Sequence, residues 1–355
     1  MDIALYGVNG FYTAGGHAGR RGDFITSPEV GPLFGAVLAR MIDAEWRRLG
    51  EPSSFTVVDA GAGPGTLSRG ILSAEPACSR ALQLIAVESS SAQREMHPVG
   101  IVSMDRMPEC IEHGVIIANE LLDNLPFGLW VHDGGWREAH VVSQGATFGE
   151  VLLPGTPGFP LREGAPHGAR APVQSGAQEW LRNALGSLSN GTVLVIDYCT
   201  ARTVEAAAMP WREWLRTYSG HERGGHYLKD PGTQDITAQV MIDQLAAVRE
   251  PDAVRTQAQF LHLWGIEELV AEGGVIKILA RIPQVEHAVI DGDDDRPAHA
   301  RALGPDPTRD IPAAPLVDAL LAKAAAALVG VASVSHSNPN DTLLEVSALG
   351  ATKAV

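Results

Sequence analysis

The stretch FTVVDAGAGPGTLSRGIL, Phe55–Leu72, constrains this chain more than any other part of its sequence. An apolar strand runs into a loop with glycines at 61, 63 and 65, and the loop runs into a predicted helix. This layout is typical of a nucleotide-binding βα turn. The dinucleotide fingerprint GxGxxG would need a third glycine at position 66 or 68, where the chain has Thr and Ser. The P-loop is excluded as well, because no Gly-Lys-Ser/Thr follows.

The remaining pattern is DxGxGxG, with Asp59 at the strand end and Gly61, Gly63 and Gly65 in the loop. A carboxylate there would repel a pyrophosphate but can hold a cationic amino group. S-adenosylmethionine (SAM) carries such a group and a sulfonium, and has no phosphate. Glu88 ends the next strand, 23 residues after Gly65, close to the spacing of about 20 expected for an acid that binds ribose hydroxyls.

We therefore predict a SAM site formed by the glycine loop, Asp59, Glu88 and the adjacent Ser89. An ordinary glycine-rich βα turn is the alternative interpretation. The position of Glu88 argues against it.

Strand-like and helix-like segments alternate along much of the chain. The predicted strands are FTVVDA, LQLIAVE, GIVS, GVIIANE and GTVLVIDY, and a predicted helix starts at Ser27 and ends before Gly50. Continuous apolar strands separated by crossovers indicate a parallel sheet covered on both faces. We predict an α/β fold: a Rossmann-like class I methyltransferase with a mostly parallel central sheet and helical and hairpin insertions.

Changes in composition divide the chain into predicted segments. The hairpin is predicted around Asp133-Gly134-Gly135, and residues 154–176, rich in Gly and Pro, are expected to be a surface loop. The predicted segments are an N-terminal lid and helix (1–50), the SAM-binding core (51–126 and 191–282), an inserted hairpin and helix (127–190), a flexible linker (283–315), and a C-terminal helix with the closing strand TLLEVSAL (316–355).

The composition limits the classes of binding partner and the cellular location that we expect. The net charge of −15 argues against binding to nucleic acid or to an anionic membrane surface. No run of about 18 apolar residues and no signal peptide is found, so no membrane partner is expected. Three widely spaced cysteines suggest reduced thiols and a cytoplasmic location, and no metal-ligand spacing occurs among the histidines. A homodimer is an open alternative to a monomer.

Four blocks carry a resemblance to a known family. GDFITSPEVGPLFG (22–35), VVDAGAGPGTL (57–67), ANELLDNLPF (118–127) and PGTQDITAQV (231–240) resemble the MidA-like SAM-dependent methyltransferases, relatives of a mitochondrial protein-arginine methyltransferase. The resemblance runs from about Ala4 to about Gly273 and implies N-methylation of a protein arginine. Methylation of a small metabolite or peptide at O or N, and a non-catalytic SAM-binding assembly factor, remain alternatives.

The block ANELLDNLP follows the fourth predicted strand, where the ligand edge of such a sheet lies. We expect Asn119 to contact the cofactor, and Glu120 and Asp123 to be catalytic. A guanidinium acceptor is protonated at ordinary pH, so carboxylates are needed to clamp it and to take up charge as it loses a proton. The alternative is that one of these acids caps the following turn.

Further candidates lie on the predicted acceptor side of the site. Asp23, Asp197 and Tyr198 are expected to face substrate, and His221 is the candidate base within the resembling segment that follows Tyr218. For Asp235 we favour capping of a helix beginning at ITAQV over direct support of the site. The expected partner is a methyl-acceptor protein or small molecule.

Overall fold

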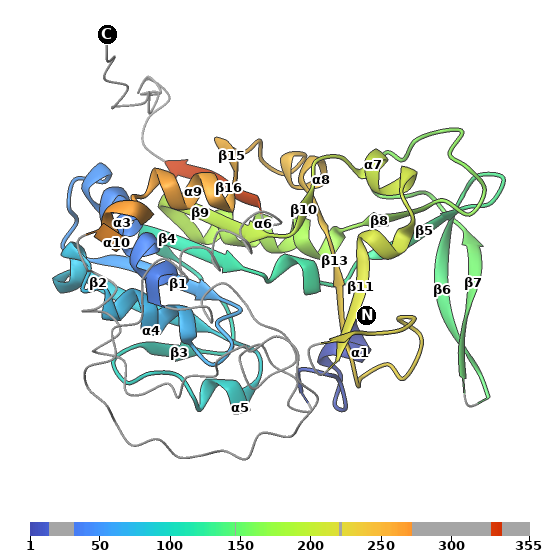
Figure 1. Cartoon of the computed structure of the whole chain (residues 1–355), viewed down its shortest axis with the longest axis horizontal. Coiled ribbons are helices and arrows are strands. Elements are labelled where there is room, and N and C mark those ends of the chain that lie inside the picture. Colours follow the sequence, from blue (N-terminus) through green and yellow to red (C-terminus); the bar gives the residue numbers. More distant parts are fainter. Residues whose placement is uncertain (14–31, 146, 220–221, 272–327, 336–355) are drawn as a thin grey trace, which may run out of the picture.

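A central sheet organises the part of the chain that the computed structural model describes, namely residues 1–13, 32–145, 147–219, 222–271 and 328–335 (Figure 1). Its strand order is β15-β16-β9-β4-β1-β2-β3. The strands are β1 (Phe55–Ala60), β2 (Leu82–Val87), β3 (Val102–Met104), β4 (Ile111–Asn119), β9 (Leu188–Asp197), β15 (Ala253–Thr256) and β16 (Leu328–Ser335). The five strands predicted from apolar runs correspond to β1, β2, β3, β4 and β9.

Parallel pairing brings the predicted site residues to one edge. Strand β1 lies between β2 and β4, with Asp59 opposite Ala86 on one side and Ile117 on the other. Strand β9 pairs in parallel with β4. The C-terminal ends of these four strands therefore meet at the same edge, and the glycine loop, Glu88 and Asp197 all follow or end a strand there.

Strand β16 runs against its neighbours. It pairs antiparallel with β9 on one side and with β15 on the other. The predicted closing strand at 342–349 lies outside the described residues. Within the same predicted C-terminal segment, the structure has a strand at Leu328–Ser335. The sequence LVGVASVS explains this position, since its β-branched valines favour a strand.

Helices cover both faces of the sheet. One face packs against α3 (Pro32–Arg48), α4 (Thr66–Ser73), α9 (Gln257–Leu263) and α10 (Ile266–Ala271), and the other against α6 (Ser175–Ser187) and α8 (Ile242–Ala246). Side chains alternate along β1 as the pleat requires: Phe55 and Val57 join the first core, Val58 and Ala60 the second. The predicted start of the first long helix at Ser27 lies outside the described residues.

The insertion after β4 forms its own antiparallel sheet, β7-β6-β5-β8. Its strands are β5 (Gly128–His132), β6 (Trp136–Gln144), β7 (Thr147–Pro154) and β8 (Arg170–Val173), and β6 and β7 form an arm that projects from the molecule (Figure 1). The β5–β6 hairpin agrees with the prediction. The predicted loop over 154–176 is wrong at β8, where Pro172 suggested a loop. Because β8 is an edge strand, it tolerates this proline.

A smaller sheet, β12-β11-β13, lies beside the N-terminal helix α1 (Asp2–Tyr6) (Figure 1). Its strands are β11 (Leu215–Ser219), β12 (Glu222–Arg223) and β13 (Asp235–Ala238). The predicted helix at ITAQV is therefore wrong: Asp235 begins a strand, because residues 235–238 pair with β11 and the next helix, α8, starts only at Ile242. Shorter elements are β10 (Cys199–Thr200), β14 (Val240–Met241), α5 (Ser91–Arg94), α7 (Thr203–Ala208), η1 (Ala77–Arg80), η2 (Leu122–Asn124) and η3 (Trp211–Glu213).

Candidate active site

The glycine loop turns tightly between β1 and α4. Gly61, Gly63 and Gly65 all have positive φ, at 70°, 53° and 78°. A Cβ at Gly61 would lie 2.8 Å from the side chain of Leu121, so the loop is in close contact with the segment that follows β4. A side chain at this position would be strained by both the backbone angle and the contact. Glycine at this position therefore lets the backbone of the loop lie close to neighbouring groups.

Glu88 points from the end of β2 toward this loop. Its Oε2 accepts a hydrogen bond from the backbone N–H of Gly63 at 3.0 Å. Its Oε1 accepts from the N–H of Ser90 at 2.8 Å and from the hydroxyl of Ser89 at 3.3 Å. Glu88 and Ser89 therefore border the glycine loop, as a pair of ribose-binding residues would. Their contact with the cofactor stays a prediction.

Asp59 has a partner that sequence reasoning missed. Its carboxylate is 2% exposed and accepts the hydroxyl of Ser68, on α4, at 2.7 Å. Ser68 occupies the position where the dinucleotide fingerprint has glycine. Burial raises the pKa of Asp59 to about 6, and the nearby charge of Glu88 adds to the rise. Asp59 thus fixes α4 to the end of β1, and its contact with an amino group stays a prediction.

Asp197 organises the segment after β4. This carboxylate, fully buried at the end of β9, accepts the N–H groups of Leu122 at 3.0 Å and Asp123 at 3.4 Å with one oxygen. Its other oxygen accepts the N–H of Tyr198 at 2.8 Å. These backbone N–H groups at the start of η2 are the ones that a capping side chain would bind. They donate to Asp197. Burial raises the pKa of Asp197 to about 7, and Glu120 adds to the rise.

Asp123 is the most unusual carboxyl of the site. It is 6% exposed, and within the described residues its Oδ1 is buried without a hydrogen-bond partner. Burial is the largest cause that raises its pKa well above the ordinary value. The negative charges of Asp197, Asp235 and Glu120 raise this pKa further. Glu120 itself has a positive φ of 50°, which is costly for a residue with a side chain. These four residues, the carboxylate cluster, concentrate negative charge near the glycine loop.

The N-terminal segment completes one wall of this cluster. The hydroxyl of Tyr12 donates to Asp235 Oδ1 at 3.0 Å, and Asn124 Nδ2 donates to the same oxygen at 3.0 Å. The hydroxyl of Tyr6 donates to the backbone carbonyl of Asn124 at 3.2 Å, and the rings of Tyr6 and Tyr12 stack with centroids 5.6 Å apart. Sequence reasoning missed these three residues; for Asn124, its place inside the block ANELLDNLP was an available signal.

The remaining candidates divide into two groups. Asn119 ends β4 beside the glycine loop, and its Oδ1 is buried with no hydrogen-bond partner in the described part of the chain. Tyr198 is half-buried next to the carboxylate cluster, and burial raises its pKa. Asp23 and His221 lie outside the described residues, so their roles stay predictions. Across the described ranges no group of three or more His, Cys, Asp or Glu is arranged to hold a metal ion, and no helix is long and apolar enough to cross a bilayer.

Comparison with known proteins identifies the family. A family model described as a putative S-adenosyl-L-methionine-dependent methyltransferase matches residues 37–259. The chain belongs to this family. A crystal structure of a likely methyltransferase from Burkholderia thailandensis, bound to S-adenosyl-homocysteine, has a TM-score of 0.70 and 26% identity, and the match covers 94% of this chain and 86% of that one.

Curated relatives point in the same direction. The mitochondrial protein arginine methyltransferase NDUFAF7 of Xenopus tropicalis is 25% identical over 329 residues, covering 75% of this chain and 70% of its own length. The Drosophila melanogaster homologue is 46% identical over 63 residues, only 18% of this chain and 14% of its own length. The human protein is 41% identical over 71 residues, 20% of this chain and 16% of its own length.

These matches decide several of the predictions. The Rossmann-like methyltransferase fold, the methyltransferase family and SAM as cofactor are confirmed. The predicted cytoplasmic location is wrong by comparison, because the matching relatives are named as mitochondrial proteins. The three cysteines, on which that prediction rested, are free in the structure, but free thiols do not discriminate between reducing compartments. The methyl acceptor is not identified by these matches.

Proposed function

We propose that this methyltransferase transfers the methyl group of SAM to a nitrogen of an arginine side chain in a protein substrate. The observation that carries the proposal is the carboxylate cluster of Glu120, Asp123, Asp197 and Asp235, which includes a buried carboxyl oxygen of Asp123 without a hydrogen-bond partner among the described residues. Such a cluster is unfavourable in the free protein. A cationic acceptor relieves it, because buried charges are tolerated when they are paired.

The residues present fit the cofactor. The left-handed glycine loop leaves backbone space beside Glu88, and Asn119 brings a buried amide oxygen with no partner in the described ranges to the same strand edge. When bound, SAM supplies the methyl group in activated form on its sulfonium. Glu88 and Asn119 would bind its polar groups, and the close contact of Gly61 with Leu121 would exclude water from one side.

The carboxylate cluster would act on the acceptor. A guanidinium has no free lone pair until it loses a proton, and its planar fork pairs well with carboxylates. Glu120 and Asp123 would hold the guanidinium in line for transfer, and one of them would take the proton that leaves nitrogen as the new bond forms. Burial and the neighbouring carboxylates raise the pKa of Asp123, which favours its protonated form before the acceptor binds. The positive charge of an incoming guanidinium favours the carboxylate form, so Asp123 would release its proton to solvent before it pairs with the acceptor.

The names of relatives also support an arginine acceptor. Curated relatives that cover most of this chain are named protein arginine methyltransferases. Asp197 is fully engaged with backbone N–H groups, so it can stabilise the positions of Asp123 and its neighbours without moving. The proposal therefore assigns clamping to Glu120 and Asp123 and positioning to Asp197.

A labelling experiment tests the proposal. The purified protein is incubated with methyl-tritiated SAM and an extract of cells that lack it, and the extract is first separated into proteins and small molecules. We expect label in the protein fraction and methylarginine after acid hydrolysis. Label confined to the small-molecule fraction would indicate methylation of a metabolite or peptide. Binding of SAM with no S-adenosylhomocysteine formed in either fraction would indicate a non-catalytic binding protein.

A further inference from the structure

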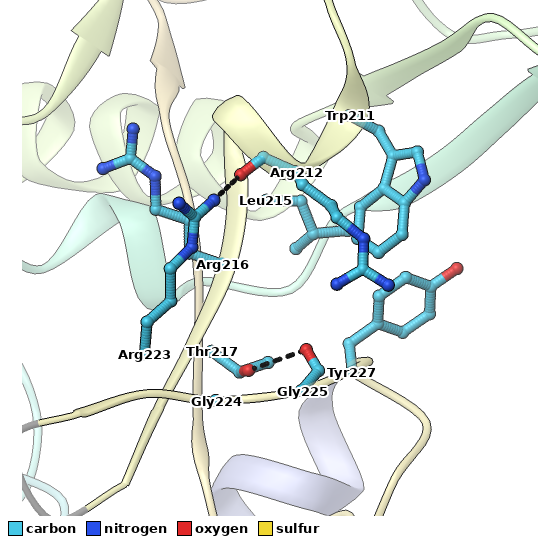
Figure 2. A pocket seen from close by; sticks show the side chains of 9 residues that line it. All are labelled: Trp211, Arg212, Leu215, Arg216, Thr217, Arg223, Gly224, Gly225 and Tyr227. Carbon is cyan, nitrogen blue, oxygen red and sulfur yellow. Dashed lines mark hydrogen bonds between the residues drawn. The ribbon is translucent and has the colours of Figure 1, made fainter.

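Three arginines surround a small opening between η3 and the β11–β12 hairpin (Figure 2). We call Arg212, Arg216 and Arg223 the arginine patch. Figure 2 shows the guanidinium of Arg212 beside the rings of Trp211 and Tyr227, while Arg216 and Arg223 lie together on the other side. The carboxylate cluster and the methyl-transfer chemistry do not use these residues.

The charges of the patch are positioned but not neutralised. Arg216 Nη2 donates to the backbone carbonyl of Glu213 at 2.6 Å, and Arg223 Nη2 donates to the backbone carbonyl of Arg212. The guanidinium carbon of Arg212 lies 4.6 Å from the ring centroid of Trp211. Within the described residues none of the three forms an ion pair with a carboxylate. The neighbouring Arg170 is different, because Glu150 pairs with it at 2.7 Å.

The opening itself is too small for a ligand of ordinary size. Its volume is about 10 Å³, room for a single water molecule. The patch therefore offers a surface of guanidinium groups and not a pocket. In a chain with a net charge of −15, three unneutralised arginines at one place favour a partner that carries several negative charges.

The patch lies next to the proposed acceptor site. In the β11–β13 pairing, Arg216 is opposite Thr237 and Tyr218 is opposite Asp235. Two residues along a strand are about 6.7 Å and one strand across is about 4.8 Å, so the backbones of Arg216 and Asp235 are about 8 Å apart. An extended peptide spans this distance in about three residues. Because the side chains at both ends add to the reach, the two contacts can be separated by up to about five residues.

We infer that the arginine patch binds an acidic segment of the protein substrate, within about five residues of the arginine that is methylated. This inference rests on the proposed function. A substrate that places an arginine in the carboxylate cluster and acidic side chains on the patch matches both surfaces in charge. A nucleic acid or an anionic membrane would extend well beyond three arginines and would meet the acidic remainder of the molecule.

The test uses a fluorescein-labelled peptide of ten glutamates and a control peptide of ten glutamines, with binding followed by anisotropy at low and at physiological salt. We expect the glutamate peptide to bind more tightly and to weaken as salt is added. Replacing the two exposed patch residues, Arg212→Gln with Arg223→Gln, should reduce its affinity about tenfold or more, because two of the three guanidinium groups that face the acidic peptide lose their charge. The matched control replaces two exposed arginines elsewhere, Arg80→Gln with Arg182→Gln, and should change affinity by less than about twofold.

Several results would overturn the inference. One is equal affinity for the glutamate and glutamine peptides. Another is a loss of affinity in the control variant as large as the loss in the patch variant. Tighter binding of single-stranded RNA or of phosphatidylglycerol vesicles, with the same dependence on Arg212 and Arg223, would assign the patch to nucleic acid or membrane. Because the probe has no arginine, its binding is independent of methyl transfer. The peptide experiment can therefore disprove binding at the arginine patch without bearing on arginine methylation, and the labelling experiment can disprove arginine methylation without bearing on the patch.

Discussion

The substitution Asp123→Asn separates a catalytic role from a structural one. Asn has nearly the shape of a protonated Asp, the form that burial and the neighbouring carboxylates favour in the free protein. Each unit by which a carboxyl pKa exceeds its ordinary value costs the folded state about 1.4 kcal/mol at a pH above both values. The variant avoids this cost, so its melting temperature should equal that of the wild type or exceed it by a few degrees.

The sign of the pH dependence follows from the same argument. Because the folded state holds its proton at a pH where the unfolded state has lost it, the stability that Asp123 contributes is present at low pH. It is lost as the pH rises above the ordinary pKa of an aspartate. The advantage of Asp123→Asn over the wild type should therefore grow as the pH rises above about 4, the ordinary pKa of an aspartate. Differential scanning calorimetry at several pH values measures it.

Methyl transfer should respond in the opposite way. Removing one partner of a buried ion pair costs roughly 3 kcal/mol, and about 1.4 kcal/mol corresponds to a tenfold change in rate. We expect single-turnover transfer to labelled protein acceptor to fall roughly a hundredfold, while affinity for S-adenosylhomocysteine changes little. The rates are compared at one pH and one temperature below both melting points.

Glu45 provides the matched control. It is also a buried carboxylate, 8% exposed, but it is fully paired: Arg48 donates to both of its oxygens at 2.7 Å and Thr192 donates at 2.7 Å. Glu45→Gln should lower the melting temperature and leave transfer intact at a permissive temperature. The reasoning is refuted if Asp123→Asn keeps transfer within about threefold of wild type, or if it is destabilised as much as Glu45→Gln.

Three further variants test the remaining assignments. Glu88→Ala should reduce affinity for S-adenosylhomocysteine at least about tenfold by calorimetric titration, because ribose hydroxyls lose charged acceptors worth roughly 1.5–3 kcal/mol each; unchanged affinity would remove Glu88 from the site. Glu120→Gln should reduce transfer about a hundredfold with only a few-fold change in cofactor affinity, and a destabilised but active protein would contradict its role. Tyr12→Phe removes the hydroxyl bonded to Asp235; it should raise KM for the acceptor and leave cofactor affinity unchanged, and a loss confined to cofactor binding would count against the N-terminal wall.

Local patterns in the sequence predict the strands and loops where we expect the cofactor. The strand Phe55–Ala60 was predicted with its observed bounds, and the glycine loop and Glu88 lie at the strand ends where parallel pairing places them. These features are readable because an apolar run and its loop are contiguous. The acceptor half is different: Tyr12 contacts Asp235 across 223 positions of sequence, and no periodicity encodes such a contact.

Strand pairing between distant segments also explains two wrong predictions of secondary structure. At Asp235 an acid precedes Ile-Thr-Ala, which resembles a helix start, yet pairing with β11 decides in favour of a strand. Pro172 likewise suggests a loop, but β8 is the last strand of its sheet, where a proline is tolerated. Both outcomes depend on partners that lie far away in the chain.

Strand β16 has a consequence for how the protein is made. The ribosome completes β9 and β15 long before it reaches Leu328, yet β16 is inserted between them and pairs with both. Until residue 335 has emerged, β9 has no neighbour on that side, and its exposed backbone groups can pair with another nascent chain. The glycine loop can form early during synthesis, whereas closure of the sheet must wait for a late, long-range step. Stalled synthesis before Leu328 would therefore leave an aggregation-prone intermediate that chaperones must protect.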